Sequence, residues 1–95
     1  MPRNKIPRCL RFNPNTLYFK PQGIPIRMLE EVTLLPDELE ALKLYEVDRL
    51  EQTTAAEKMK ISQPTFARIL DSANRKIAEA IIKGKAIRIE KQEVD

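Results

Sequence analysis

The sequence predicts a mainly α-helical fold, in which three helices form a helix-turn-helix domain behind an extended N-terminal arm. Apolar residues recur at three- and four-residue spacing over residues 36–47, 51–59 and 63–83, which is the period of an amphipathic helix. Five prolines fall within the first 25 residues and disfavour a regular helix there. A chain of 95 residues is long enough for one domain with a modest core.

The arm is the first predicted element, and its charges are all positive. It has a net charge of +6, and its aromatic and apolar side chains are expected to pack on the helical core rather than to stack on bases. Cys9 is the only cysteine, so an intrachain disulfide is excluded and we expect a free thiol. The expected apolar anchors of the arm are Phe12, Leu17, Tyr18 and Phe19.

The first helix is expected after a short strand. Pro36 suits a first helical position, and the acidic residues that follow it favour the positive end of the helix dipole. Residues 31–34 and 86–90 have strand character, and we expect them to pair as a short two-stranded β element. The predicted division is therefore an arm at residues 1–27, a helix-turn-helix domain at 28–90 and a tail at 91–95.

Residues 52–71, QTTAAEKMKISQPTFARILD, have the pattern of a helix-turn-helix. Ala55 and Met59 are four residues apart and share one face of the first helix, and Ala56 is small enough to let the second helix cross closely. The alternative interpretation of this periodicity is a plain helical hairpin with a solvated outer face.

The second helix of the motif is expected to begin at Ser62 and to stop at Gly84. The Ser62 hydroxyl can cap a free backbone N–H, and Pro64 lies in the first turn, where no N–H partner is lost. Lys60 departs from the usual pattern, because many such turns contain glycine. A left-handed conformation costs a residue with a Cβ roughly 1 kcal/mol.

A recognition helix lays its N-terminal residues against base edges in the major groove. We therefore predict base contacts from Gln63, Pro64 and Arg68, with Arg favouring guanine and Gln favouring adenine. The predicted phosphate contacts are polar or basic residues around that helix, namely Lys58, Lys60, Thr65, Ser72, Arg75 and Lys76.

The net charge of +3 is unevenly distributed along the chain. Residues 28–57 carry a net charge of −7, residues 58–88 carry +6, and the last seven residues carry −2. A positive recognition half would attract phosphates and add affinity that falls steeply with salt. The alternative is that these charges form an ordinary solvated face.

Several classes of protein are disfavoured. The chain has no histidine and no Gly-rich loop, so it offers neither an acid–base group near neutral pH nor a phosphate cradle, and we expect no enzyme. Glu38 with Glu40, or Glu30 with Glu31, could imitate a catalytic carboxylate pair, but we expect all four to be solvated. A zinc site would have to be built from carboxylates, so no metal or cofactor is expected.

The expected location is the cytoplasm. No run approaches the roughly 18 apolar residues of a membrane span, and the N-terminal segment MPRNKIPRCLRF lacks the uninterrupted apolar stretch of a signal peptide.

Four segments of the chain resemble a known family. These are YFKPQGIP, LPDELEALKL, AAEKMKISQPTFARILDSANRKIAEA and GKAIRIE, and in this order they resemble the small prokaryotic family called domain of unknown function 134. The resemblance implies a DNA-binding protein whose helix-turn-helix is similar to region four of sigma factors. By that analogy residues 62–75 would enter the groove.

The expected function is that of a sequence-specific DNA-binding protein, a transcriptional regulator that reads duplex DNA. A homodimer contact through Ile81 and Ile82 is expected, because the far half of the long helix has more apolar surface than a small domain covers. The alternative is a protein-interaction adaptor that docks on RNA polymerase or another regulator through the acidic helix at 36–47 and an uncovered apolar patch.

Overall fold

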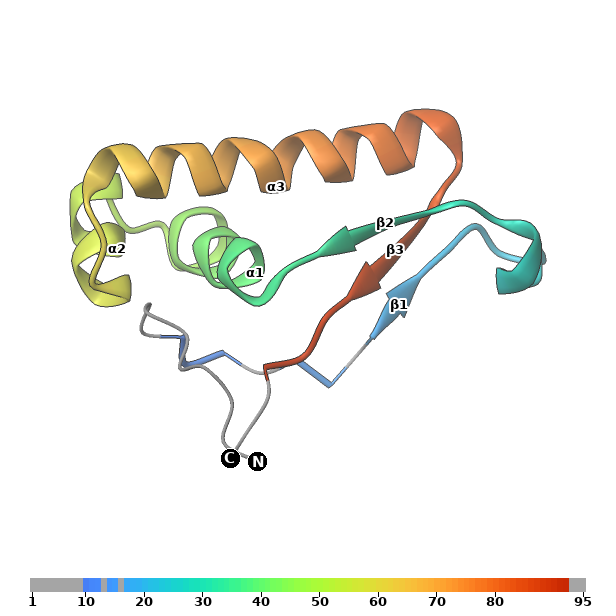
Figure 1. Ribbon diagram of the computed structural model, residues 1–95, viewed down its shortest axis with the longest axis horizontal. Helices are drawn as coiled ribbons and strands as arrows, with labels where there is room; N and C mark the ends of the chain where they lie inside the picture. Colours follow the sequence, from blue (N-terminus) through green and yellow to red (C-terminus); the bar gives the residue numbers. More distant parts are fainter. Residues whose placement is uncertain (1–9, 13, 16, 93–95) are drawn as a thin grey trace, which may run out of the picture.

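The computed structural model describes residues 10–12, 14–15 and 17–92, and it is mainly helical with a small sheet (Figure 1). Cys9 and the first three bases of the arm lie outside these residues. The helices are α1 (Pro36–Leu42), α2 (Gln52–Met59) and α3 (Gln63–Lys83), and the strands are β1 (Tyr18–Phe19), β2 (Glu31–Leu34) and β3 (Ala86–Ile89). A 3-10 turn, η1 (Ile26–Met28), precedes β2, and a π-helical turn, η2 (Lys43–Val47), continues α1.

The long helix α3 joins the two halves of the molecule (Figure 1). It packs against α1 and α2 and also against β2 and β3. Its apolar residues recur at helical spacing, and the buried ones are Phe66, Ile69, Leu70, Ala73 and Ala80. One amphipathic helix therefore positions its own N-terminus beside α2 and its C-terminus beside the sheet.

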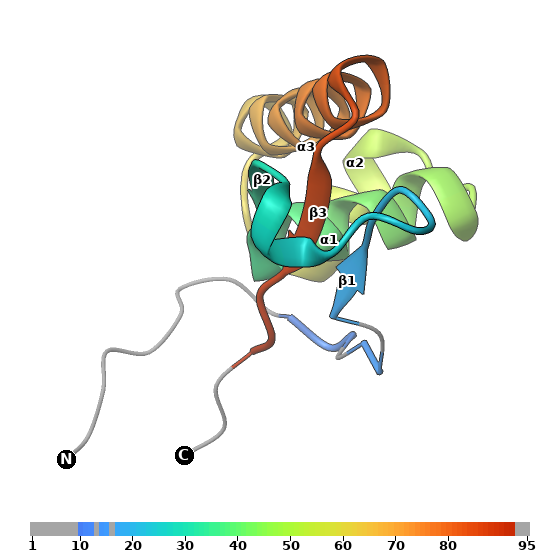
Figure 2. The ribbon, with the colours of Figure 1, turned by 90° about the vertical axis from the view of Figure 1, so that its right-hand side faces the viewer.

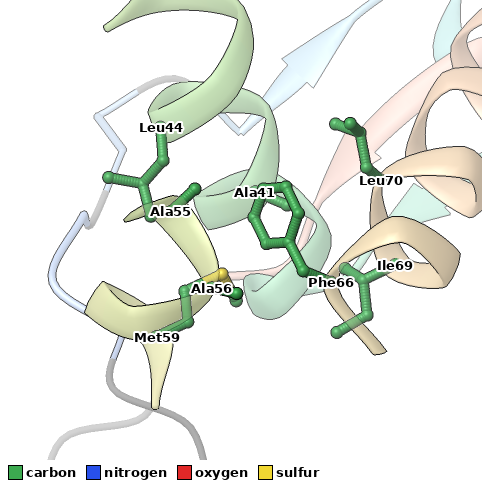
Figure 3. Close-up of a cluster of buried hydrophobic side chains, with 8 residues drawn as sticks. All are labelled: Ala41, Leu44, Ala55, Ala56, Met59, Phe66, Ile69 and Leu70. Carbon is green, nitrogen blue, oxygen red and sulfur yellow. The ribbon is translucent and has the colours of Figure 1, made fainter. Parts of the chain in front are cut away.

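The larger core cluster lies between α1, η2, α2 and the first half of α3 (Figure 3). Phe66 and Met59 are its largest fully buried side chains. The Tyr45 ring meets the Phe66 ring edge to face, with 6.5 Å between the ring centroids. Small residues of α1 and α2, namely Ala41, Ala55 and Ala56, are fully or almost fully buried and let the helices approach closely.

The smaller cluster lies between α3 and the sheet. Leu34 of β2, Ala73 of α3 and Ile89 of β3 are buried together, and Leu39, Leu42, Ile77 and Ile87 pack around them. Leu42 contacts both clusters, so the helical half and the sheet share one continuous apolar interior.

The sheet has three strands in the order β1-β3-β2 (Figure 2). Strand β2 pairs with β3 in parallel, with Leu34 opposite Ile89, which confirms the predicted pairing of the two segments. The prediction of only two strands was wrong, because β1 pairs antiparallel with the other edge of β3, with Tyr18 opposite Arg88. A two-residue strand in a proline-rich arm has no local periodicity, so only its contact with β3 defines it.

The described part of the arm is held by backbone hydrogen bonds and by Leu10, which packs against the larger cluster. The backbone N–H groups of Arg11 and Phe12 donate to Glu40 Oε1 at 3.0 and 2.8 Å, and Gln92 Nε2 donates to the Phe12 carbonyl at 2.8 Å. The prediction that four apolar side chains anchor the arm in the core was wrong: Phe12, Leu17, Tyr18 and Phe19 are all exposed.

Two carboxylates predicted to be solvated are buried. Glu38 and Glu40 have only 4% and 3% of their surface exposed. Each is compensated by hydrogen-bond donors from other parts of the chain, as buried charges require. They have structural roles in fixing the arm and α3 to α1.

Among the residues that the structure describes, none of the helices has both the length and the apolar composition needed to span a membrane.

Candidate nucleic-acid interface

The connection between α2 and α3 is a tight turn at residues 60–62. Lys60 adopts the left-handed conformation, with φ 60° and ψ 44°, at the position where the sequence pattern favours glycine. The Lys60 N–H donates to the Glu57 carbonyl at 3.0 Å, and the Ile61 N–H reaches back to the Ala56 carbonyl at 3.1 Å. Ile61 then packs against the larger core cluster. This turn fixes how α3 leaves α2.

The N-terminus of α3 is capped as the sequence predicts. Ser62 Oγ accepts a hydrogen bond from the Thr65 N–H at 3.3 Å, and Pro64 lies in the first turn. The Ser62 hydroxyl also donates to Thr65 Oγ1 at 2.9 Å, and Arg68 Nη2 donates to the same oxygen at 3.2 Å. These bonds order the first two turns of the helix.

The three predicted base-contacting residues, Gln63, Pro64 and Arg68, are all exposed on these first turns. Pro64, Arg68, Asp71 and Arg75 follow one another at spacings of four, three and four residues, so they form one stripe along α3. We call these four residues the outer stripe. The opposite side of the same turns carries the buried Phe66, Ile69, Leu70 and Ala73.

The predicted phosphate contacts divide into separate groups. Lys60 and Arg75 are exposed, Lys60 at the turn and Arg75 on the outer stripe. Thr65 is half-buried and is engaged in the capping bonds. Lys58 is exposed but lines a shallow hollow together with Arg11, Lys43 and Asp48, on the side of α2 that faces the arm.

Ser72 and Lys76 face inward and are bound to Glu38. The Ser72 hydroxyl donates to Glu38 Oε2 at 2.5 Å, and Lys76 Nζ donates to Glu38 Oε1 at 2.8 Å and to the Thr33 carbonyl at 2.7 Å. Glu38 Oε1 also accepts the Leu35 N–H at 2.9 Å, which caps α1. Ser72 and Lys76 are therefore half-buried, and their donor groups already have partners in this network.

Two residues of the site were not predicted. Asp71 lies on the outer stripe, with a carboxylate oxygen 3.9 Å from Arg75 Nε, and it places a negative charge among the exposed bases. Gln52, the first residue of α2, accepts a hydrogen bond from Gln63 Nε2 at 3.4 Å. The sequence shows that both glutamines begin a helix, but only the crossing of α2 and α3 brings them together.

The far end of α3 has a different character. Lys85 Nζ lies 2.5 Å from Glu79 and 3.4 Å from Glu30. The hydrogen bond from Lys85 holds the pKa of the Glu79 carboxyl below its usual range, and the same bond raises the pKa of Lys85.

The same end of α3 carries exposed apolar residues, since Ile81 and Ile82 are 71% and 81% exposed. Ile81 also lines a shallow hollow with Phe19, Pro21 and Ile87.

The described part of the chain contains no cluster of three or more Asp, Glu, Cys or His side chains that could hold a metal ion. The exposed groups around the start of α3 include the amide of Gln63, the guanidinium of Arg68 and the ammonium of Lys60, which can donate hydrogen bonds to base edges and phosphates.

Comparison with known proteins identifies the family. The family model described as "Protein of unknown function DUF134" matches residues 1–95. A UPF0251 protein of Caldanaerobacter subterraneus is 54% identical over 90 residues, which cover 95% of this chain and 76% of the relative. A UPF0251 protein of Moorella thermoacetica is 51% identical over 90 residues, which cover 95% of this chain and 60% of the relative.

A third relative, from Dehalococcoides mccartyi, is 51% identical over 85 residues, which cover 87% of this chain and 73% of the relative. No solved structure matches the chain. The family match over the full sequence and these identities agree, and the chain therefore belongs to the DUF134 family, whose relatives are named UPF0251 proteins.

Proposed function

We propose that this chain is a cytoplasmic, sequence-specific DNA-binding protein that regulates transcription. In this proposal α2, the turn at residues 60–62 and α3 form a helix-turn-helix similar to region four of sigma factors, and the start of α3 enters the major groove. The observation that carries the proposal is the outer stripe, which is exposed on a helix whose opposite side is buried.

The dimensions and chemistry of this surface suit duplex DNA. The major groove, about 12 Å wide, admits an α-helix. Exposed Gln63 and Arg68 have side chains that reach base edges, and half-buried Ala67 between them is small enough for close approach. Lys60 precedes and Arg75 follows these two base-contacting residues in the sequence, and both supply positive charge for contacts with phosphates.

The apolar end of α3 favours a second copy of the chain. Ile81 and Ile82 are the most exposed isoleucines of the described residues, and a two-fold contact through them would leave both α3 N-termini available to DNA. One recognition helix reads only a few base pairs, so two copies would raise specificity. The alternative is an adaptor that docks on a protein partner through the acidic helix at 36–47. The structure weakens it, because Glu38 and Glu40 of this helix are buried and cannot contact a partner.

The test is selection of bound fragments from a random duplex DNA library at about 150 mM salt, near physiological ionic strength. The wild type is compared with Arg68→Ala and Arg75→Ala, which remove the same side chain from two positions of the outer stripe. We expect an enriched motif for the wild type. Arg68→Ala should cost about 1 to 3 kcal/mol and relax preference at one base pair, whereas Arg75→Ala should weaken binding to all sequences alike.

The outcomes distinguish four cases. An enriched motif that degrades only in Arg68→Ala supports the proposal and both roles. An enriched motif with equal losses for both variants refutes the assignment of roles. Binding without any enriched motif refutes sequence-specific recognition, and binding to RNA polymerase without DNA binding would support the adaptor.

A further inference from the structure

The first residues of α2 and α3 are linked by their side chains. Gln63 Nε2 donates a hydrogen bond to Gln52 Oε1 at 3.4 Å. Gln52 is half-buried, whereas Gln63 is exposed. The bond therefore joins a partly fixed amide on one helix to an amide that faces solvent on the next.

This bond determines what Gln63 can still offer to a ligand. A primary amide has two N–H groups and one carbonyl oxygen. The bond to Gln52 uses one N–H and leaves one donor and one acceptor. Adenine presents the complementary pair in the major groove, because its N7 accepts and its N6 amino group donates.

The reverse arrangement would select a different base. If the Gln63 carbonyl accepted a bond from Gln52, its two N–H groups would remain. Two donors match guanine, whose N7 and O6 are both acceptors in the major groove. The direction of the bond between the two glutamines therefore controls which purine fits.

We propose that Gln52 is a positioning residue that orients the Gln63 amide and thereby makes the protein prefer adenine over guanine at one base pair. This inference rests on the proposed function. It goes further because it makes a residue on α2 responsible for the base preference of a residue on α3.

The experiment replaces Gln52 with residues that can only accept or only donate. Gln52→Glu keeps an acceptor for the Gln63 N–H. Gln52→Lys supplies only donors, so the Gln63 amide should reverse its orientation and accept a hydrogen bond through its carbonyl oxygen. Gln52→Ala removes the partner. Fragment selection on wild type and Gln63→Ala first locates the base pair that Gln63 reads, and fluorescence anisotropy then measures binding to duplexes with adenine or guanine there.

The expected result is a change in the ratio of the two affinities. The wild type should prefer adenine by roughly 5- to 150-fold, the range of a good bidentate contact. Gln52→Glu should retain that preference, Gln52→Ala should reduce it by about 2- to 10-fold, and Gln52→Lys should favour guanine. The charge introduced by Glu or Lys alters the affinity for both duplexes alike, so its effect cancels in the ratio of the two affinities.

Matched controls separate orientation from charge and from folding. Thr53→Glu and Thr53→Lys introduce the same charges at the exposed neighbouring position and should leave the ratio unchanged. Thermal unfolding confirms that each variant is folded. Equal ratios in wild type, Gln52→Glu and Gln52→Lys, or a motif unaffected by Gln63→Ala, overturn this inference while the proposed function stands. The absence of any enriched motif overturns both.

Discussion

Replacement of Lys60 by glycine should stabilise the fold and weaken DNA binding at the same time. Lys60 is exposed at the turn between α2 and α3, with φ 60° and ψ 44°. Its backbone conformation is unfavourable for a residue with a Cβ, while its ammonium group is a proposed phosphate contact. One substitution removes both the strain and the charge.

The stability gain follows from two opposing contributions. A left-handed conformation costs a residue with a Cβ roughly 1 to 2 kcal/mol, whereas glycine costs about 0.4 to 1 kcal/mol in additional unfolded-state entropy. These ranges give a net gain between about 0 and 1.6 kcal/mol. For a domain of this size, each kcal/mol raises Tm by about 4 to 8 °C, so a gain of about 0.8 kcal/mol, the middle of that range, should raise Tm by about 3 to 6 °C.

Arg49 provides a matched control within the same chain. It is exposed, carries the same charge and has φ 64°, but it lies in the connection between η2 and α2 rather than in the turn between α2 and α3. Arg49→Gly should therefore raise Tm by a similar amount. The DNA affinity of the Arg49→Gly variant should stay unchanged. Lys60→Gly should reduce the slope of log K for DNA binding against log[salt] by about 1, which is the contribution of one phosphate contact.

Differential scanning calorimetry and anisotropy titrations at several salt concentrations measure the two effects. A lower Tm for Lys60→Gly would refute the strain argument. Equal loss of DNA affinity in Lys60→Gly and Arg49→Gly would refute the placement of Lys60 on the interface.

Three other predictions concern the interior and the far end of α3. Glu38→Ala leaves the Leu35 N–H and the Ser72 hydroxyl without their acceptor and leaves the Lys76 ammonium with only the Thr33 carbonyl. It should lower the free energy of unfolding in urea by about 2 to 4 kcal/mol, and an unchanged midpoint would contradict it. Because the pKa of Glu79 is lowered and that of Lys85 is raised, their pair should stabilise the wild type over Glu79→Gln between the ordinary values of 4.5 and 10.5. That advantage should disappear in thermal melts as pH falls through the lowered pKa of Glu79 or rises through the raised pKa of Lys85, and a difference that persists in strong acid would argue against the pair. Light scattering should report a dimer for the wild type and a single chain for Ile82→Glu, so identical masses would exclude the proposed contact.

The helices could be predicted because their signals are local. Pro36 marks the start of α1, Ser62 caps α3, and Gly84, with φ 68°, ends it. Each of these residues acts on backbone groups within a few positions of itself, so sequence spacing is sufficient. The π-helical turn η2 is different, because its hydrogen-bond pattern has no signature in the apolar periodicity of residues 36–47.

The polar residues of the candidate site were only partly predictable. The sequence places Ser72 and Lys76 on the polar side of α3 and so predicts surface residues. In the structure both bind Glu38, which lies more than thirty positions earlier in the chain. The same applies to Glu40, whose partners are backbone N–H groups of the arm. Local patterns place a residue on a helix face, but they do not identify the buried partner that engages it.

The parallel pairing of β2 with β3 has a consequence for the order of folding. Residues 35–85, which include all three helices, lie between the two strands. Closing an unstructured loop of about fifty residues costs roughly 3.5 kcal/mol, apart from a constant, in chain entropy. Once α1 has packed on α3, however, the strand ends already lie near each other. The sheet should therefore form after the helices, and any substitution that loosens α1 from α3 should weaken strands that it does not touch.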